Sequence, residues 1–225
     1  MWEASYGQGV YVLMTSRIDK QFKGQDEKFL QALFEAAIRR PILRFIFLAW
    51  GNHAKEIREA IEFSGLQKQF IMLSPVGKKR LIDYYRSCDI VLDHFIFGYH
   101  GATGLEAAAI GKPVIIKLRT EHYGPWYQGD YMPAQNASTP NEITQKLIML
   151  ADNPDVRQSN GLEMRRWLVR RHGEEKTVPL LLSLLRLAAD RVSLPQDIAN
   201  PLRAEETEAE WAYHAKCLQE RSTLK

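Results

Sequence analysis

Residues 93–117 read DHFIFGYHGATGLEAAAIGKPVIIK, and the rest of the chain is organised around this stretch. Its pattern predicts the end of a strand, a glycine-punctuated loop, a short helix that opens at Leu105, a turn, and a buried strand near Pro113. Three glycines allow turns and a close approach of the backbone to a ligand that a Cβ would prevent: Gly98, Gly101 and Gly104. We therefore expect a ligand to lie between this loop and the helix.

The rest of the chain repeats the order of apolar run, short loop and amphipathic helix. Apolar runs of strand length start near Gly9, Leu43, Phe70, Asp89 and Pro113. Such alternation with short connections predicts an α/β fold with a doubly wound, parallel, Rossmann-like sheet. Helical patterns continue after the last of these strands. We expect residues 1–194 to form this domain with its C-terminal helices, and residues 195–225 to form a charged helical tail.

Composition limits the classes of function that the chain can have. The 225 residues are 45% hydrophobic and 25% charged, which is ordinary for a globular protein. The net charge of +3 is too small to indicate a nucleic-acid partner. The two cysteines, Cys88 and Cys217, predict neither a disulfide framework nor a metal site, and no apolar run approaches the ~20 residues that span a bilayer. We expect a cytoplasmic protein that needs no metal or other cofactor.

The start of the helix in residues 93–117 is suited to an anion, because the first amides of a helix have no partners within it. We expect Glu106 in the first helical turn, where its carboxylate can accept hydrogen bonds from the hydroxyls of a ligand. A carboxylate in that position also stabilises the helix by roughly 0.3–1 kcal/mol without any ligand. The residues by themselves leave both roles of Glu106 open.

The segment GLEAAAIGKPVI, residues 104–115, resembles the EAMA-x-GxPVI signature of the glycosyl transferases group 1, which are retaining, nucleotide-sugar-dependent glycosyltransferases of the GT-B fold. The resemblance implies that the chain is the C-terminal, donor-binding half of such a fold. In the family the glutamate of this motif holds the ribose of the donor, and Glu106 matches it. The implied contacts of the donor come from the helix start and from the loop after the third strand: Val76, Gly101, Ala102, Thr103, Gly104, Leu105 and Glu106.

A second segment of the same family character follows the first strand, SRIDKQFKGQD, residues 16–26. By charge pattern alone it is a solvated loop. The family has a GR-x-KG segment here, whose arginine and lysine neutralise the diphosphate of the donor, and Arg17 and Lys23 match these positions. Ser16 replaces the usual glycine, and Lys20 is an alternative to Lys23. The resemblance thus implies that Arg17, Lys23 and Glu106 stabilise the departing nucleoside diphosphate.

Two departures from the family keep more than one function open. Gly98 stands where the family often has the first glutamate of an E-x7-E pair, and the expected acceptor-binding half would have to come from a partner chain. The first hypothesis is transfer of a glycosyl group from a nucleotide sugar to an unknown acceptor. The second is a non-catalytic nucleotide-sugar-binding or structural module. A dinucleotide-dependent dehydrogenase fits less well, since no Gly-x-Gly-x-x-Gly follows the first strand.

The most basic segment is residues 165–172, RRWLVRRH. Such a run is typical of a solvated helix face. Because tryptophan and arginine both suit membrane interfaces, a peripheral contact with an anionic membrane is the alternative prediction.

Overall fold

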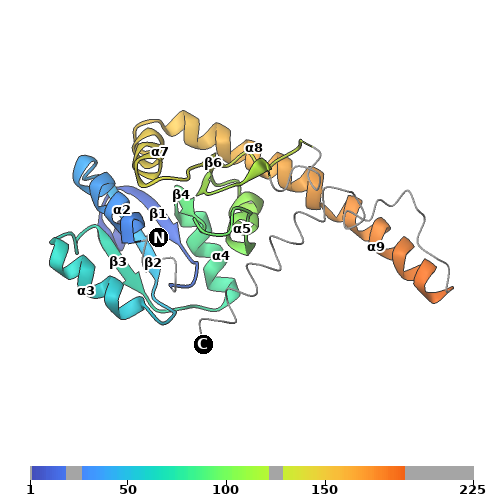
Figure 1. Cartoon of the computed structure of the whole chain (residues 1–225), viewed down its shortest axis with the longest axis horizontal. Coiled ribbons are helices and arrows are strands. Elements are labelled where there is room, and N and C mark those ends of the chain that lie inside the picture. The colour runs from blue at the N-terminus through green and yellow to red at the C-terminus, as the bar shows by residue number, and fades with distance from the viewer. Residues whose placement is uncertain (1, 19–26, 122–128, 191–225) are drawn as a thin grey trace. The chain divides into compact units, whose positions relative to one another are not determined.

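The computed structural model describes residues 2–18, 27–121 and 129–190 (Figure 1). The chain separates into two units, one of Met1–Leu118 with Met132–Arg171 and the other of Arg119–Tyr131 with His172–Lys225. The first unit contains the whole sheet. The predicted division into residues 1–194 and 195–225 stays a prediction, because the tail lies outside the described residues.

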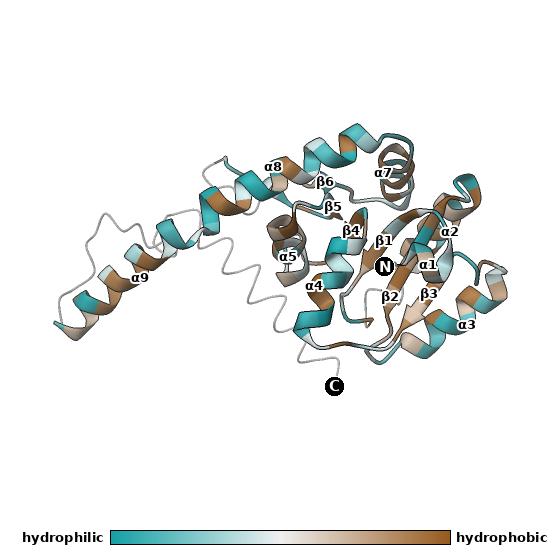
Figure 2. Cartoon of the chain, turned by 180° about the vertical axis from the view of Figure 1, so that it is seen from behind, coloured by the Kyte–Doolittle hydropathy of each residue, from teal (hydrophilic) through white to brown (hydrophobic). Residues whose placement is uncertain are grey.

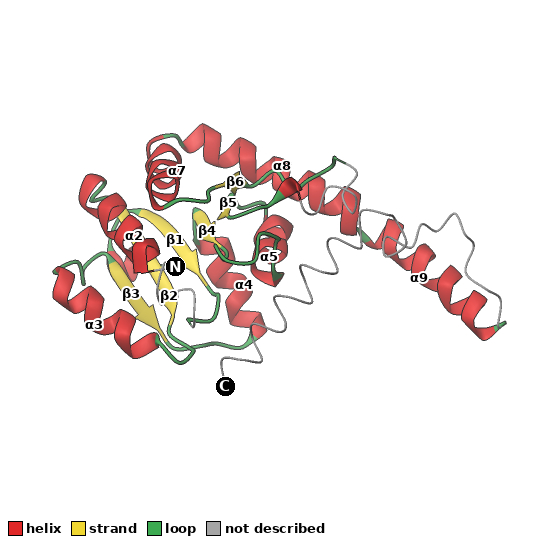
Figure 3. Ribbon diagram, in the orientation of Figure 1, coloured by secondary structure: helices red, strands yellow, loops and turns green. Residues whose placement is uncertain are grey.

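The described strands form one parallel sheet in the order β3-β2-β1-β4-β5-β6, as Figure 3 shows. The strands are β1 (Val10–Met14), β2 (Leu43–Leu48), β3 (Phe70–Leu73), β4 (Ile90–Leu92), β5 (Val114–Ile116) and β6 (Gln135–Asn136). The helices are α1 (Glu3–Tyr6), α2 (Glu27–Arg39), α3 (Ala54–Ser64), α4 (Lys78–Ser87), α5 (Ala102–Ile110), α7 (Pro140–Asp152), α8 (Pro154–His172) and α9 (Glu174–Ala189). The predicted doubly wound α/β fold and its five parallel strands are therefore confirmed.

The sixth strand, β6, was not predicted from the sequence. It consists of two polar residues, Gln135 and Asn136, so no apolar run in the sequence indicates a strand there. Pairing with β5 supplies its backbone partners. The amide side chain of Asn136 adds two further bonds, accepting from the Leu118 amide at 2.8 Å and donating to the Leu118 carbonyl at 2.9 Å.

Both faces of the sheet are covered, and the interior strands are accordingly apolar, apart from Arg44 near the start of β2 (Figure 2). On β1, Val10, Val12 and Met14 share one buried cluster with residues of α2, α3 and α7. Successive side chains of a strand point to opposite faces, so Tyr11 and Leu13 lie on the other face. There Trp2 contacts both Tyr11 and Tyr84 of α4, with ring centroids 5.5 and 5.4 Å apart.

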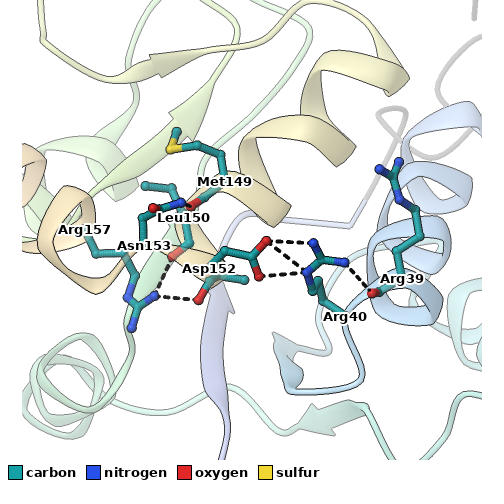
Figure 4. Close-up of polar contacts among 8 residues, drawn as sticks. Arg39, Arg40, Met149, Leu150, Asp152, Asn153 and Arg157 are labelled. Atoms are coloured by element: carbon teal, nitrogen blue, oxygen red, sulfur yellow. Dashed lines mark hydrogen bonds and ion pairs between the residues drawn. The ribbon is translucent and has the colours of Figure 1, made fainter.

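An exposed ion pair ties the ends of α2 and α7 together (Figure 4). Arg40, directly after α2, binds Asp152 with both prongs of its guanidinium, Nε to Oδ1 at 2.7 Å and Nη2 to Oδ2 at 2.7 Å. On α7 itself, Asn153 Nδ2 donates to the Met149 carbonyl at 2.7 Å, which closes the helix end. Solvent screens an exposed pair of this kind, so it fixes helix position more than it stabilises the fold.

The basic segment of α8 differs from the prediction in one respect. Trp167 is only 1% exposed, and its ring meets that of His100 edge-on with centroids 5.5 Å apart. It is a core residue, so its predicted role at a membrane interface is wrong. Arg165, Arg166 and Arg170 of the same segment are exposed.

The second unit contains helix α9, in the part of the chain where helical patterns were predicted to continue after the last strand. Several of its leucines are exposed: Leu180, Leu181, Leu182 and Leu185. In the described part of the chain, no helix combines the length and apolarity that crossing a bilayer demands.

Candidate functional site

The topology itself selects one place for a ligand. The strand order reverses between β1 and β4, and in open α/β sheets ligands bind beyond the carboxyl ends of the strands at such a point. A cavity of about 600 Å³ lies there. Its walls come from the loop after β1, the loop after β2, and the loop that joins β4 to α5: Thr15, Ser16, Arg17, Trp50, Asn52, His53, Asp93, His94, Ile96, Phe97, Gly101, Ala102 and Thr103.

Helix α5 begins at Ala102, three residues before the predicted start at Leu105. Its first turn contains no acidic residue, so the predicted place of Glu106 in that turn is wrong, and Glu106 lies in the second turn. The reason is a carboxylate from outside the helix. Asp93 accepts hydrogen bonds from the amides of Gly101 and Gly104 at 3.1 and 3.0 Å, and thereby does the work of an N-cap side chain.

Asp93 is nearly fully buried at 1% exposure and also accepts the amide of His94 at 3.0 Å. Burial raises the pKa of Asp93, while His94 and the three amides oppose that rise. Of the four orphan amides at the start of α5, Asp93 uses two. The other two, from Ala102 and Thr103, line the cavity and have no acceptor among the described residues.

His94 is 9% exposed and lines the same cavity. Its Nδ1 is buried without a hydrogen-bond partner in the described chain. Burial lowers the pKa of His94 and outweighs the raising effect of Asp93, so the ring is neutral near pH 7. The ring edges of Phe97 and Tyr99 hold it, with centroids 5.1 and 5.7 Å away.

A chain of hydroxyls connects the floor of the cavity to Glu106. Thr15 Oγ1 lies 2.9 Å from Thr103 Oγ1 and 3.0 Å from the Tyr85 hydroxyl. Burial raises the pKa of Tyr85, and the neighbouring carboxylate of Glu106 raises it further. Glu106 also forms an ion pair with Lys78 at the start of α4, and its side chain is 25% exposed.

Arg17, in the loop after β1, lines the same cavity as the start of α5. Its guanidinium carbon is 5.9 Å from the centre of the Trp50 ring, and Trp50 is held by a hydrogen bond from its Nε1 to the Thr15 carbonyl at 2.9 Å. Arg17 is exposed, so its charge reaches the cavity without a desolvation cost. The other predicted cations of this loop, Lys20 and Lys23, lie outside the described residues.

The structure brings only part of the predicted site to this cavity. Arg17, Gly101, Ala102 and Thr103 line it, whereas Val76, Gly104, Leu105 and Glu106 do not. The sequence did not predict a site residue in the loop after β2, which supplies Trp50, Asn52 and His53. His94 was not predicted as a site residue either. The available signal was a polar Asp-His pair directly after the buried strand β4, where an apolar residue would be the default.

Other nucleophiles and ligands in the first unit do not form a site. Cys88 is fully buried, its Sγ contacts the Tyr85 carbonyl at 3.2 Å, and burial raises the pKa of its thiol to about 12. Within residues 2–18, 27–121 and 129–190, no cluster of three or more His, Cys, Asp and Glu side chains is arranged to hold a metal ion.

The sheet order, the helices on both faces and a cavity at the switch point define a Rossmann-like domain of the kind that forms one half of a GT-B fold. The sequence profile of the glycosyl transferases group 1 matches residues 9–153, and the chain belongs to that family. No match was found among the curated proteins.

Solved structures with the same fold include three bacterial proteins. A variant of S. aureus TarM in complex with fondaparinux, α-GlcNAc-glycerol and UDP has a TM-score of 0.63 at 15% identity, over 78% of this chain and 35% of that one. Anabaena HepE in complex with UDP gives 0.64 at 16% identity, over 82% and 50%. The C-terminal domain of the group 1 protein LpcC from Francisella tularensis gives 0.57 at 18%, over 74% and 86%. The chain thus spans half or less of the length of TarM and HepE.

Proposed function

We propose that the chain is the donor-binding half of a retaining glycosyltransferase and binds a nucleoside-diphosphate sugar in the cavity beside α5. One observation carries the proposal: Ala102 and Thr103, whose amides have no acceptor among the described residues, line the same cavity as the cationic Arg17. Amides at a helix start and a guanidinium are the groups that bind phosphate oxygens best. Membership of the glycosyl transferases group 1 supports the same assignment.

In this proposal the diphosphate lies between Arg17 and the start of α5. Asp93 uses two of the four amides at the helix start, so binding of an anion also depends on the cations of the loop after β1. Lys23 would add a second cation. As the bond to the sugar breaks, charge develops on the leaving diphosphate, and these groups stabilise it electrostatically. No metal is required for this role.

The ribose of the donor is assigned to Glu106. Its carboxylate pairs with Lys78, which is 68% exposed, so a bound ribose would compete with a solvated cation that can withdraw into water. The hydroxyls of Thr103, Thr15 and Tyr85 connect this position to the cavity. The base would then lie near the loop that contains Val76.

Transfer also needs an acceptor and the second half of a GT-B fold. The acceptor is unassigned, and the other half would come from a partner chain or from further sequence of a longer protein. A cytoplasmic location would give such an enzyme access to nucleotide sugars. Contact with an anionic membrane would rest on the exposed arginines of α8.

A non-catalytic nucleotide-sugar-binding module is the second candidate, and Gly98 favours it. This residue has φ of +82°, in the left-handed region that side chains rarely adopt. A glutamate at this position, as in the E-x7-E pair, would be strained, so the loop is built differently from one that carries that acid. A module with this loop could bind the donor and leave catalysis to another protein.

Calorimetric titration with UDP and with GDP tests the proposed function, and UDP is the first choice because TarM and HepE were crystallised with it. Arg17→Ala should weaken binding by about 1.5–3 kcal/mol, the value of a charge-assisted hydrogen bond. Arg58→Ala, an exposed arginine on α3, is the matched control and should change nothing. Absence of binding by the unaltered chain, or equal affinities for both variants, would refute the diphosphate site.

Glu106→Gln separates the two roles of that residue. A ribose contact predicts weaker binding of UDP and almost no change for its 2′,3′-dideoxyribose counterpart, because the discrimination comes from the hydroxyls. A purely structural role predicts a lower melting temperature and equal losses for both ligands.

A further inference from the structure

One residue that lines the cavity beside the start of α5 is His94, whose ring packs against Phe97 and Tyr99. His94 is nine-tenths buried, yet neither ring nitrogen has a hydrogen bond to any described residue. Buried polar groups nearly always have partners, and an exception calls for a functional explanation. The backbone amide of His94 is bound to Asp93 at 3.0 Å, so the residue is held in place while its ring remains available.

The position of the ring tells which nitrogen faces a ligand. A Cβ placed on Gly101, the residue before α5, would be 3.5 Å from His94 Nε2, so Nε2 lies beside the start of the helix. Nδ1 is buried away from solvent. A buried nitrogen that has no hydrogen-bond partner costs less free energy as a bare lone pair than as an N–H group. Buried N–H groups without an acceptor are accordingly the rarer case in proteins. The proton therefore belongs on Nε2, and the ring offers a donor at the edge of the phosphate site.

The rest of this wall is apolar and aromatic. Ile96 and Phe97 follow His94 in the same loop, and Trp50, anchored through its Nε1, lines the same cavity from the loop after β2. Phe97 and Trp50 are 42% and 43% exposed. Flat apolar rings beside a hydrogen-bond donor suit a pyranose, which has C–H groups on its faces and hydroxyls on its edge. Asn52 and His53 line the same cavity and offer further polar groups to its hydroxyls.

We propose that His94 is a specificity-determining residue for the transferred sugar: its Nε2–H donates a hydrogen bond to an oxygen of a neutral hexosyl group whose ring lies between Trp50 and Phe97. This inference rests on the proposed function, since the sugar is placed by its diphosphate. His94 would supply a polar contact to the sugar from the loop that contains Gly98. The left-handed backbone at Gly98 disfavours the first glutamate of the E-x7-E pair at that position.

The test measures the sugar increment, which is the affinity for a nucleotide sugar divided by the affinity for its nucleoside diphosphate. The probes are UDP with UDP-glucose and UDP-N-acetylglucosamine, and GDP with GDP-mannose, titrated into the full chain. His94→Ala should lower the increment of the preferred sugar roughly tenfold, as expected for a lost buried hydrogen bond, and leave the affinity for the diphosphate unchanged. His94→Gln should retain most of the increment, because the glutamine amide can place an N–H near the position of Nε2.

His100→Ala is the matched control, because His100 lies in the same loop, does not line the cavity and packs on Trp167. It should leave the increment unchanged. Equal losses for the diphosphate and the nucleotide sugar in His94→Ala would overturn the sugar contact while leaving the diphosphate site intact. An increment of one for every sugar in the unaltered chain would also overturn it. Failure of UDP and GDP themselves to bind would instead refute the proposed function on which the inference rests.

Discussion

Helices α5 and α7 begin in opposite ways, and the difference separates a ligand site from a structural helix end. At α7, Thr139 accepts the Glu142 amide at 3.3 Å and the Glu142 carboxylate accepts the Thr139 amide at 3.0 Å, while Pro140 has no amide to satisfy. At α5 the cap comes from Asp93, eight residues before Gly101, and two amides stay open to the cavity. At α7 the local side chains bind the amides of Thr139 and Glu142 on an exposed surface. At α5 the distant carboxylate binds the amides of Gly101 and Gly104 and leaves those of Ala102 and Thr103 without an acceptor among the described residues.

This comparison predicts that perturbing the start of α5 alters both stability and ligand binding, whereas perturbing the start of α7 alters stability alone. The following experiments test that contrast.

Asp93→Ala should have the largest effect. It removes the acceptor of three amides in a nearly fully buried place, and we expect a loss of about 3 kcal/mol in the free energy of unfolding together with a loss of UDP affinity. Urea denaturation and calorimetry measure the two. Asp93→Asn keeps an acceptor oxygen and should lose less of each. A destabilised Asp93→Ala that binds UDP normally would break the proposed link between this cap and the site.

Gly104→Ala should have the next largest effect, because its Cβ would lie 2.8 Å from Asp93 Oδ2. The carboxylate must move, at a cost of about 1–3 kcal/mol for overpacking. Gly101→Ala is the control from the same turn, since its Cβ would make ordinary contacts at 3.5 Å. Thermal unfolding of both variants should therefore show a clear difference between them. Similar melting temperatures would mean that Asp93 does not set the start of α5.

Thr139→Ala should lower stability by about 1 kcal/mol, as is typical for a lost N-cap. Its affinity for UDP should be unchanged, because no residue of the α7 start lines the cavity. Thr139→Ser, which retains the hydroxyl, should restore the stability. Weaker binding of UDP in the alanine variant would contradict the division between the two helix ends.

The smallest effect is a pH dependence of opposite sign at the two helix starts. Amides of Ser138 and Thr139 hold the pKa of Glu142 below its ordinary value, so its contribution to stability is present above the unfolded pKa and is lost as pH falls through the folded pKa. Burial raises the pKa of Asp93 in the folded protein. The contribution of Asp93 to stability therefore increases as pH falls through this raised pKa.

Glu142→Gln should therefore flatten part of the loss of stability below about pH 5, where the glutamate of the unfolded chain begins to bind protons, measured by urea denaturation at each pH. Glu163→Gln, an exposed carboxylate on α8, is the control. If both variants lose stability equally at low pH, the carboxylate of Glu142 does not contribute to the pH dependence of stability.

The sequence by itself determined the five apolar strands, the helices between them, the glycine-rich loop and the family motif around Glu106. Local patterns indicate these features: apolar runs of strand length, helical spacing of leucines and alanines, and glycine where the chain turns. Parallel order followed from them, because short loops and intervening helices leave few other topologies. The capping box at Thr139 and Glu142 is equally local, since its members are three residues apart.

Only the tertiary structure decided which residues meet around the cavity. Thr15 and Thr103 are 88 residues apart in sequence and form one hydrogen bond, and Trp50 reaches Thr15 across 35 residues. The start of α5 depends on Asp93, and the burial of Trp167 on its packing against His100. Local pattern records the periodicity of each element, whereas contacts between elements depend on how side chains of distant segments fill the same space. The pairing of β5 with β6 and the orientation of His94 belong to that second class.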